Sequence, residues 1–333
     1  MNASWEPDIW GSVRRNVEAT TASAQASAAL LAATRLSAQA SLAQYYFELR
    51  GLDTDQKLLD DTVQEYKKIL RYAKNRYASG VDSEADILQA KGQLENAQAS
   101  AINNGVLRAQ YEHAIAVLIG VPPAEFSLAP HPLRATPPPI PIEVPSELLE
   151  RRPDIAQAER LAAEANAQIG VAVAAYYPTL SLTGSASTMA KKLFSVPSLS
   201  WTLGSQLADT IFDGGLRSAT VKAAQAAYCA NAASYRQIVL AAFQDVEDNL
   251  AALRILAKQS SYQNQAAVDA KKSLQLTLNQ YRAGTVDYNS VLLAQVSAFS
   301  AEKTAADLIY LRMTTAVGLI KALGGGWNAQ SLN

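Results

Sequence analysis

The strongest constraint on this chain is the length of its segments without proline or glycine. Residues 216–281 contain neither. At a rise of 1.5 Å per residue, this segment would be about 100 Å long if it were helical throughout. Residues 13–77 are interrupted only by Gly51, and further helical runs are expected at 81–119 and 285–323. Helices of globular proteins average about 11–12 residues, so the sequence predicts extended helical hairpins.

The two halves of the chain resemble each other. Residues 75–80 (NRYASG) match residues 279–284 (NQYRAG), and Gly284 stands 204 positions after Gly80. Between the halves, ten of the 13 prolines fall in residues 122–153, which predicts an extended, helix-free linker. We infer an internal duplication. Each copy holds a helical hairpin whose turn is a Tyr-x-x-Gly segment, and a glycine permits the tight turn.

Between Tyr176 and Asp213 the pattern changes to a period of two. Leucines and small apolar residues alternate with serines and threonines in two runs, near 180–187 and 199–211. This alternation predicts two antiparallel strands, of a length that suits a membrane-spanning strand. An ordinary hairpin with one solvated face has the same pattern. The long flanking helices favour the membrane alternative, because they leave little else for the apolar face to pack against.

Composition narrows the classes of function. The chain has 29 Lys and Arg against 30 Asp and Glu, a net charge of -1, so no basic surface points to nucleic acid. No apolar run reaches 18 residues, so no transmembrane helix is predicted. Cys229 is the only cysteine and is expected to pack in a helix seam. His113 and His131 are too isolated for a metal site. We therefore predict no enzyme, no cofactor and no metal.

Several segments resemble the TolC/NodT-like outer-membrane efflux proteins. Residues 148–155 read LLERRPDI, residues 169–182 run from IGVA to YPTLSL, and residues 211–215 read IFDGG and continue to FQDVE at 243–247. The two Tyr-x-x-Gly tips are the fourth shared feature. The similarity extends from about Ser4 to Gly324 and is specific as a combination.

The resemblance implies a mostly α fold with a β-hairpin. Three protomers would form a periplasmic α-barrel of long helical hairpins and share one 12-stranded transmembrane β-barrel. A single hairpin has unpaired edges, which lipid does not tolerate, so closure by a homotrimer agrees with the physics. The implied location is the bacterial outer membrane with a periplasmic extension. The implied partners are outer-membrane lipid, a periplasmic adaptor (membrane fusion) protein and an inner-membrane RND-type pump.

The implied function is that of an exit channel of a tripartite efflux pump. It is a passive conduit for drugs and toxic compounds, gated at the periplasmic helix tips, in the lipoprotein branch linked to antibiotic resistance. Two alternatives share the fold: a type I secretion exit channel and a non-functional, truncated remnant. A soluble coiled-coil scaffold would fit the helices but not the paired strands.

The expected organisation combines the duplication with the resemblance. The segments are the end of a first β-hairpin (1–12), the first-repeat helical hairpin (13–120), the Pro-rich linker (121–152), a helix (153–175), the second β-hairpin (176–213), the second-repeat helical hairpin (214–324) and a tail (325–333). By this alignment the counterparts of residues 153–210 would precede Met1. We therefore expect an N-terminally truncated chain that does not close a pore by itself, with its signal peptide and lipidated cysteine missing.

The resemblance also implies the functional residues, which lie at the two tips. The residues expected to dock the adaptor are Tyr77, Gly80, Val81, Gly284, Thr285 and Val286. Tyr281 and Asp86 match a tyrosine–aspartate pair, and a charge-assisted hydrogen bond between them would latch the channel shut.

The acidic constriction of the family is altered here. Ser290 and Leu293 stand where aspartates often line the pore, and Asp287 is the nearest acid. A ring of Leu293 side chains would gate by dewetting instead. Val286 replaces an arginine of the family, so a second latch is not expected.

Overall fold

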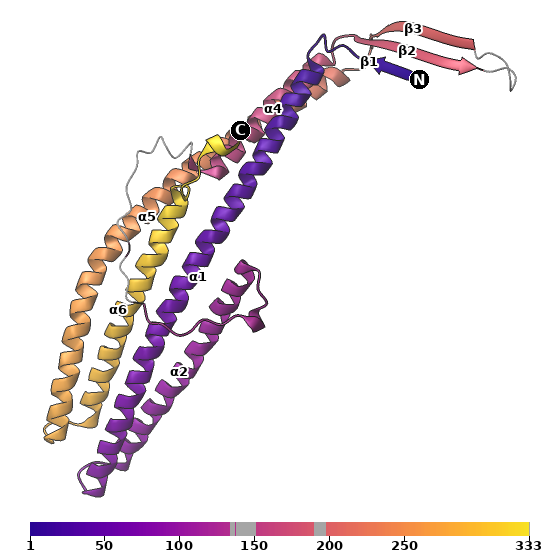
Figure 1. The fold of residues 1–333 in the computed structure, drawn as a ribbon. Helices are drawn as coiled ribbons and strands as arrows, with labels where there is room; N and C mark the ends of the chain where they lie inside the picture. Colours follow the sequence, from indigo (N-terminus) through magenta and orange to yellow (C-terminus); the bar gives the residue numbers. More distant parts are fainter. Residues whose placement is uncertain (134–136, 138–150, 190–197, 333) are drawn as a thin grey trace. The chain divides into compact units, whose positions relative to one another are not determined.

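The chain was analysed in a computed structural model that describes residues 1–133, 137, 151–189 and 198–332 (Figure 1). Its α-helices are α1 (Ser12–Ala78), α2 (Glu84–Ile119), α4 (Pro153–Ala174), α5 (Leu216–Arg282) and α6 (Tyr288–Ala322). Its strands are β1 (Asn2–Trp5), β2 (Thr179–Met189) and β3 (Ser198–Ala208), and two single 3₁₀ turns are η1 (Pro123–Glu125) and η3 (Ala329–Leu332). The predicted helical hairpins and strands are therefore present.

The chain divides into two compact units. The first holds residues 1–33, 145–242 and 326–333, and the second holds 34–144 and 243–325. Helices α1 and α5 each contribute their first part to the first unit and their remainder to the second. The two units are described separately below.

A three-stranded antiparallel sheet in the order β1-β2-β3 belongs to the first unit (Figure 1). The register of β2 and β3 places Leu180 opposite Leu207 and Ala186 opposite Trp201, so the apolar residues of both strands share one face. The side chains of Trp201 and Leu207 are about 70% exposed. The sheet thus presents an apolar face that nothing in the described chain covers. The turn of the hairpin, 190–197, lies outside the described residues.

Small residues allow α1 and α4 to pack closely in the first unit. Ala19 and Ala29 of α1 and Ala167 of α4 are completely buried. A Cβ added to Gly170 of α4 would lie 2.8 Å from the Arg15 side chain of α1. Alanine both favours helix and lets backbones approach, so the Ala-rich composition is explained by this seam. Cys229 of α5 was expected to pack in such a seam, but it is exposed. That expectation is wrong for the single chain, because the surrounding face of α5 has no partner in it.

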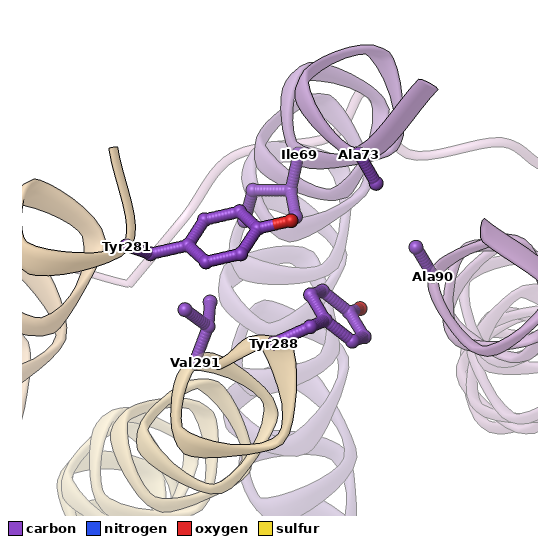
Figure 2. Packing of buried hydrophobic residues seen from close by; sticks show 6 residues of the cluster. All are labelled: Ile69, Ala73, Ala90, Tyr281, Tyr288 and Val291. Carbon is purple, nitrogen blue, oxygen red and sulfur yellow. The ribbon is translucent and has the colours of Figure 1, made fainter. Parts of the chain in front are cut away.

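The second unit contains the two helical hairpins, α1–α2 and α5–α6. A cluster of buried residues joins them: Ile69 and Ala73 of α1, Ala90 of α2, Tyr281 of α5, and Tyr288 and Val291 of α6 (Figure 2). Further along α1, Val63 and Tyr66 pack with Ala97 of α2. The core of this unit is therefore a narrow seam of helix-facing side chains, and helix packing of this kind depends on interdigitating ridges and grooves.

The apolar stripe expected on α6 is misplaced by one residue. The sequence pattern selected Leu292, Val296, Phe299, Ile309, Met313, Ala316, Ile320 and Leu323. The buried residues include Val291, Gln295, Ala298, Leu308 and Leu319, together with Met313 and Ala316. The helix has two adjacent apolar stripes, and hydrophobicity favours the larger side chains. Close packing buries the stripe with smaller ones. Val296 is half exposed and Ile320 is 42% exposed.

The linker predicted for residues 121–152 falls mostly outside the described residues. In the described part, 121–133 is extended except for the turn η1, so the expectation of a helix-free segment needs that small correction. This part is fastened to α1 and α2. The Arg50 guanidinium donates to the carbonyl of Ala129, the backbone N–H of His131 donates to Asp53, and that of Leu133 donates to Thr54.

Two helix glycines in the second unit are expected to respond oppositely to substitution by alanine. A Cβ at Gly51 would lie 2.5 Å from Cδ1 and 2.7 Å from Cγ of Tyr310, whereas a Cβ at Gly92 would meet nothing within 4 Å. Overpacking costs about 1–3 kcal/mol, and replacing a helical Gly by Ala contributes about 1 kcal/mol. In thermal unfolding, Gly92→Ala should raise the melting temperature and Gly51→Ala should lower it. Equal shifts would contradict this packing of Tyr310.

Candidate gate at the helix tips

Two equivalent turns position the residues at the tips of the second unit. The backbone N–H of Val81 donates to the carbonyl of Arg76, and that of Gly80 donates to Tyr77. At the equivalent positions 204 residues later, Thr285 donates to Gln280 and Gly284 donates to Tyr281. This pair of bonds is a Schellman motif, which needs a left-handed residue after the helix. Gly80 and Gly284 supply it, with φ of 75° and 76°.

The helix that follows each turn begins with a side-chain cap, in which the two residue types exchange places. In α2, Ser83 is the N-cap and Asp86 is three residues later. Their side chains accept from each other's backbone N–H in a capping box. In α6, Asp287 is the N-cap and accepts from the N–H and hydroxyl of Ser290, at 3.0 and 2.6 Å. Three predicted gate residues, Asp86, Asp287 and Ser290, therefore initiate helices.

The predicted partner of Tyr281 is wrong. The Tyr281 hydroxyl donates a hydrogen bond of 2.5 Å to the Asp82 carboxylate, not to Asp86. The physical reason is the capping box. The Asp86 oxygen Oδ2 accepts from both the N–H and the hydroxyl of Ser83, which holds the carboxylate over the start of α2. Asp82 lies in the loop before the cap, where its side chain is 8% exposed.

Arg76 completes a three-residue network that joins the two hairpins. Its Nε donates to both carboxylate oxygens of Asp82, at 2.9 and 3.0 Å, and its Nη1 donates to the backbone carbonyl of Tyr281 at 2.9 Å. The guanidinium also lies over the Tyr281 ring, 4.7 Å from the centroid, a favourable cation–π arrangement. We name Arg76, Asp82 and Tyr281 the tip network. It connects the end of α1 and its loop to the end of α5.

The tip network stands against the buried cluster, which controls its protonation. Tyr281 is 2% exposed and its ring meets that of Tyr288 edge-on at 6.1 Å (Figure 2). Burial, followed by the adjacent Asp82 carboxylate, raises the pKa of Tyr281 well above its usual range, and burial raises the pKa of Tyr288 to about 12. Both effects disfavour the phenolate. Tyr281 therefore remains a hydrogen-bond donor at neutral pH.

The other predicted tip residues differ in exposure. Tyr77 is 46% exposed and Val81 is 63% exposed, and Thr285 is also exposed. Val286 instead packs against the buried cluster, so a contact of this side chain with a docked protein is not supported. Leu293 points away from the cluster and is 65% exposed.

Sequence reasoning missed Arg76 and Asp82, although a signal was available. The positions equivalent to them in the second copy are Gln280 and Val286, so a pair of opposite charges six residues apart occurs in one copy only. A difference of this kind between two otherwise similar tips indicates a role that only one of them has. The search for a family pattern looked at the second copy, where neither charge exists.

Two further searches were made over the described residues. None of the helices in the described part combines the length and the apolar character that a membrane-spanning helix requires. Among the same residues, no three or more His, Cys, Asp or Glu side chains gather closely enough to hold a metal ion.

Comparison with known proteins supplies the family. The description "outer membrane efflux protein" covers the family that matches residues 1–121 and 144–325. The probable efflux pump outer membrane protein TtgC of Pseudomonas putida is 31% identical, over 99% of this chain and 69% of that protein. The cation efflux system protein CusC of Escherichia coli O6:H1 is 29% identical, over 98% of this chain and 72% of its own length.

Among solved structures, that of the outer-membrane channel OprN has a TM-score of 0.94 and 30% sequence identity. The match covers 98% of this chain and 74% of that one. The residues that carried the resemblance in the sequence and the arrangement of the helical hairpins lead to the same assignment. The chain belongs to the outer membrane efflux protein family, whose members are TolC-like channels of the outer membrane.

Proposed function

We propose that the protein is a passive exit conduit for drugs and other toxic compounds. The observation that carries the proposal is the sheet of the first unit. In the described chain β3 pairs only with β2, so its other edge is open, and the shared apolar face is exposed. Unpaired strand edges are not stable in lipid. Pairing with further copies would remove the edges, and a homotrimer with twelve strands would enclose a pore.

The exposed face of α6 supports the same assembly. Leu293, Val296, Leu311 and Ile320 are 42–65% exposed along one long helix. A series of large apolar side chains along a helix is typical of a surface that packs against another helix. In the proposed trimer these residues would line the helical barrel or contact a neighbouring protomer. Leu293 would form an apolar constriction near the tips.

The partners follow from the relatives. TtgC is described as an efflux pump outer membrane protein, and CusC as part of a cation efflux system. We infer that this protein receives its substrates from an inner-membrane RND-type pump through a periplasmic adaptor. Tyr77, Val81 and Thr285 are exposed beside the two turns and form the proposed docking surface with Gly80 and Gly284.

The tip network is the proposed latch of this channel. It holds the first hairpin of a protomer against the second through one carboxylate, one guanidinium and one phenol. Separation of the hairpins at the tip would break all of these contacts at once. We propose that the network stabilises the closed state and that opening requires its rupture.

The conduit is tested in a bacterial strain that lacks its own outer-membrane efflux channel. The natural gene of this protein, expressed together with a cognate adaptor and RND pump, should restore tolerance to the toxic substrates of that pump. The same gene in a strain without the pump should give no tolerance, which separates transport from general resistance. A protein that reaches the outer membrane in both strains but restores tolerance in neither would refute the proposed function.

A further inference from the structure

A cavity of about 130 Å³ lies in the second unit, away from the tip network. Three helices line it: α1 with residues 58–66, α5 with 271–278 and α6 with 295–302. A cavity of about 150 Å³ in another protein holds benzene, so this volume suffices for a chain of about four carbon atoms. The walls are partly apolar and include Leu58, Leu274, Leu278 and Phe299.

A buried polar atom faces this cavity. Gln295 of α6 lines it and is 3% exposed, and its side-chain oxygen Oε1 has no hydrogen-bond partner. A buried acceptor without a donor costs about 1–3 kcal/mol, so such atoms require an explanation. A ligand that brings an N–H donor into the cavity would satisfy it.

The mouth of the cavity carries an excess of negative charge. Asp61, Glu65 and Glu302 lie around it with a single cation, Lys271. Lys271 pairs with Glu302 at 2.8 Å, and neither Asp61 nor Glu65 has an ion pair with another described residue. The pKa of Lys271 is raised by Glu302 first and also by Glu65 and Asp61. Two carboxylates at the mouth are thus uncompensated.

We propose that this cavity is a binding site for a short aliphatic diamine. One ammonium group would donate to Gln295 Oε1, the methylene chain would lie against the leucine walls, and the second ammonium would meet Asp61 and Glu65. Two positive charges balance the two uncompensated carboxylates. A chelated metal ion fits less well, since among the described residues no group of carboxylates is close enough to hold one. The site is independent of the proposed transport function.

The proposal is tested by calorimetric titration of 1,4-diaminobutane into the purified protein in detergent at low salt. One saturable site per chain is expected. The double variant Asp61→Asn/Glu65→Gln should weaken binding at least about fivefold, the effect of one well-formed exposed ion pair. The matched control is Asp60→Asn, an exposed carboxylate on the same helix that pairs with Gln56 and does not line the cavity. It should bind as the unaltered protein does.

Two further measurements separate a built site from diffuse attraction of cations. 1-Aminobutane, which has one ammonium, should bind more weakly than the diamine, and MgCl₂ at equal concentration should not displace the diamine. Gln295→Leu should weaken binding as well. The double variant alters only exposed side chains, so the test stands even if the Gln295 variant does not fold. Equal weakening by Asp60→Asn, or displacement by Mg²⁺, would overturn the proposal.

Discussion

Asp53→Ala is expected to destabilise the second unit by about 3–5 kcal/mol, the usual cost of removing one partner from a buried ion pair. The Asp53 side chain is 1% exposed. It accepts from Arg108 at 2.8 Å and from Arg50 at 2.9 Å, and these arginines are 18% and 9% exposed. Alanine would leave two guanidinium groups without their shared carboxylate, in a place where water cannot replace it.

The loss should appear first in the segment that Asp53 fastens. The same carboxylate accepts the backbone N–H of His131, and Arg108 donates to the carbonyl of Leu128 at 2.5 Å. Hydrogen exchange of residues 126–133 should therefore accelerate in Asp53→Ala. Asp60→Ala serves as the control, because Asp60 is exposed on the same helix, and a surface change of this kind stays within about 0.5 kcal/mol. Unchanged exchange in Asp53→Ala would mean that the segment is held by other contacts.

Asp82→Ala is expected to shift the proposed channel strongly towards its open state. Arg76 and Asp82 are 20% and 8% exposed and Tyr281 is 2% exposed, so the variant leaves a guanidinium and a phenol without their partner. A loss of about 3 kcal/mol corresponds to about a hundredfold change in an equilibrium constant. Tyr281→Phe keeps the ring under Arg76 and removes one hydrogen bond to a charged group, about 1.5–3 kcal/mol.

The readouts are single-channel open probability in lipid bilayers and leakage of antibiotics into cells that express the natural gene. Asp82→Ala should exceed Tyr281→Phe in both. Asp86→Asn is the matched control, since it removes a tip carboxylate that belongs to the cap of α2 and not to the network. If Asp86→Asn opened the channel as much as Asp82→Ala, the latch would depend on the charge of the tip and not on the bond to Tyr281.

Much of the architecture follows from local sequence signals. The strands were expected from a period of two and appear as β2 and β3 in register. The turns were expected from the two glycines, and both adopt the left-handed conformation. The helix starts at Ser83 and Asp287 are capped by residues three positions away. These features depend on neighbours in the chain, so a sequence contains what is needed to predict them.

Tertiary structure decided which side chains meet. The sequence alone could propose that Tyr281 binds an aspartate of the other tip, but Asp82 and Asp86 lie on one short loop and helix start. The choice between them rests on the capping box, which occupies Asp86, and on Arg76, which holds Asp82 beside the phenol. The buried stripe of α6 was misplaced for a related reason. A rotation of about 100° per residue separates neighbouring positions on a helix, and only the packing against α1 and α5 determines which of two apolar stripes is buried.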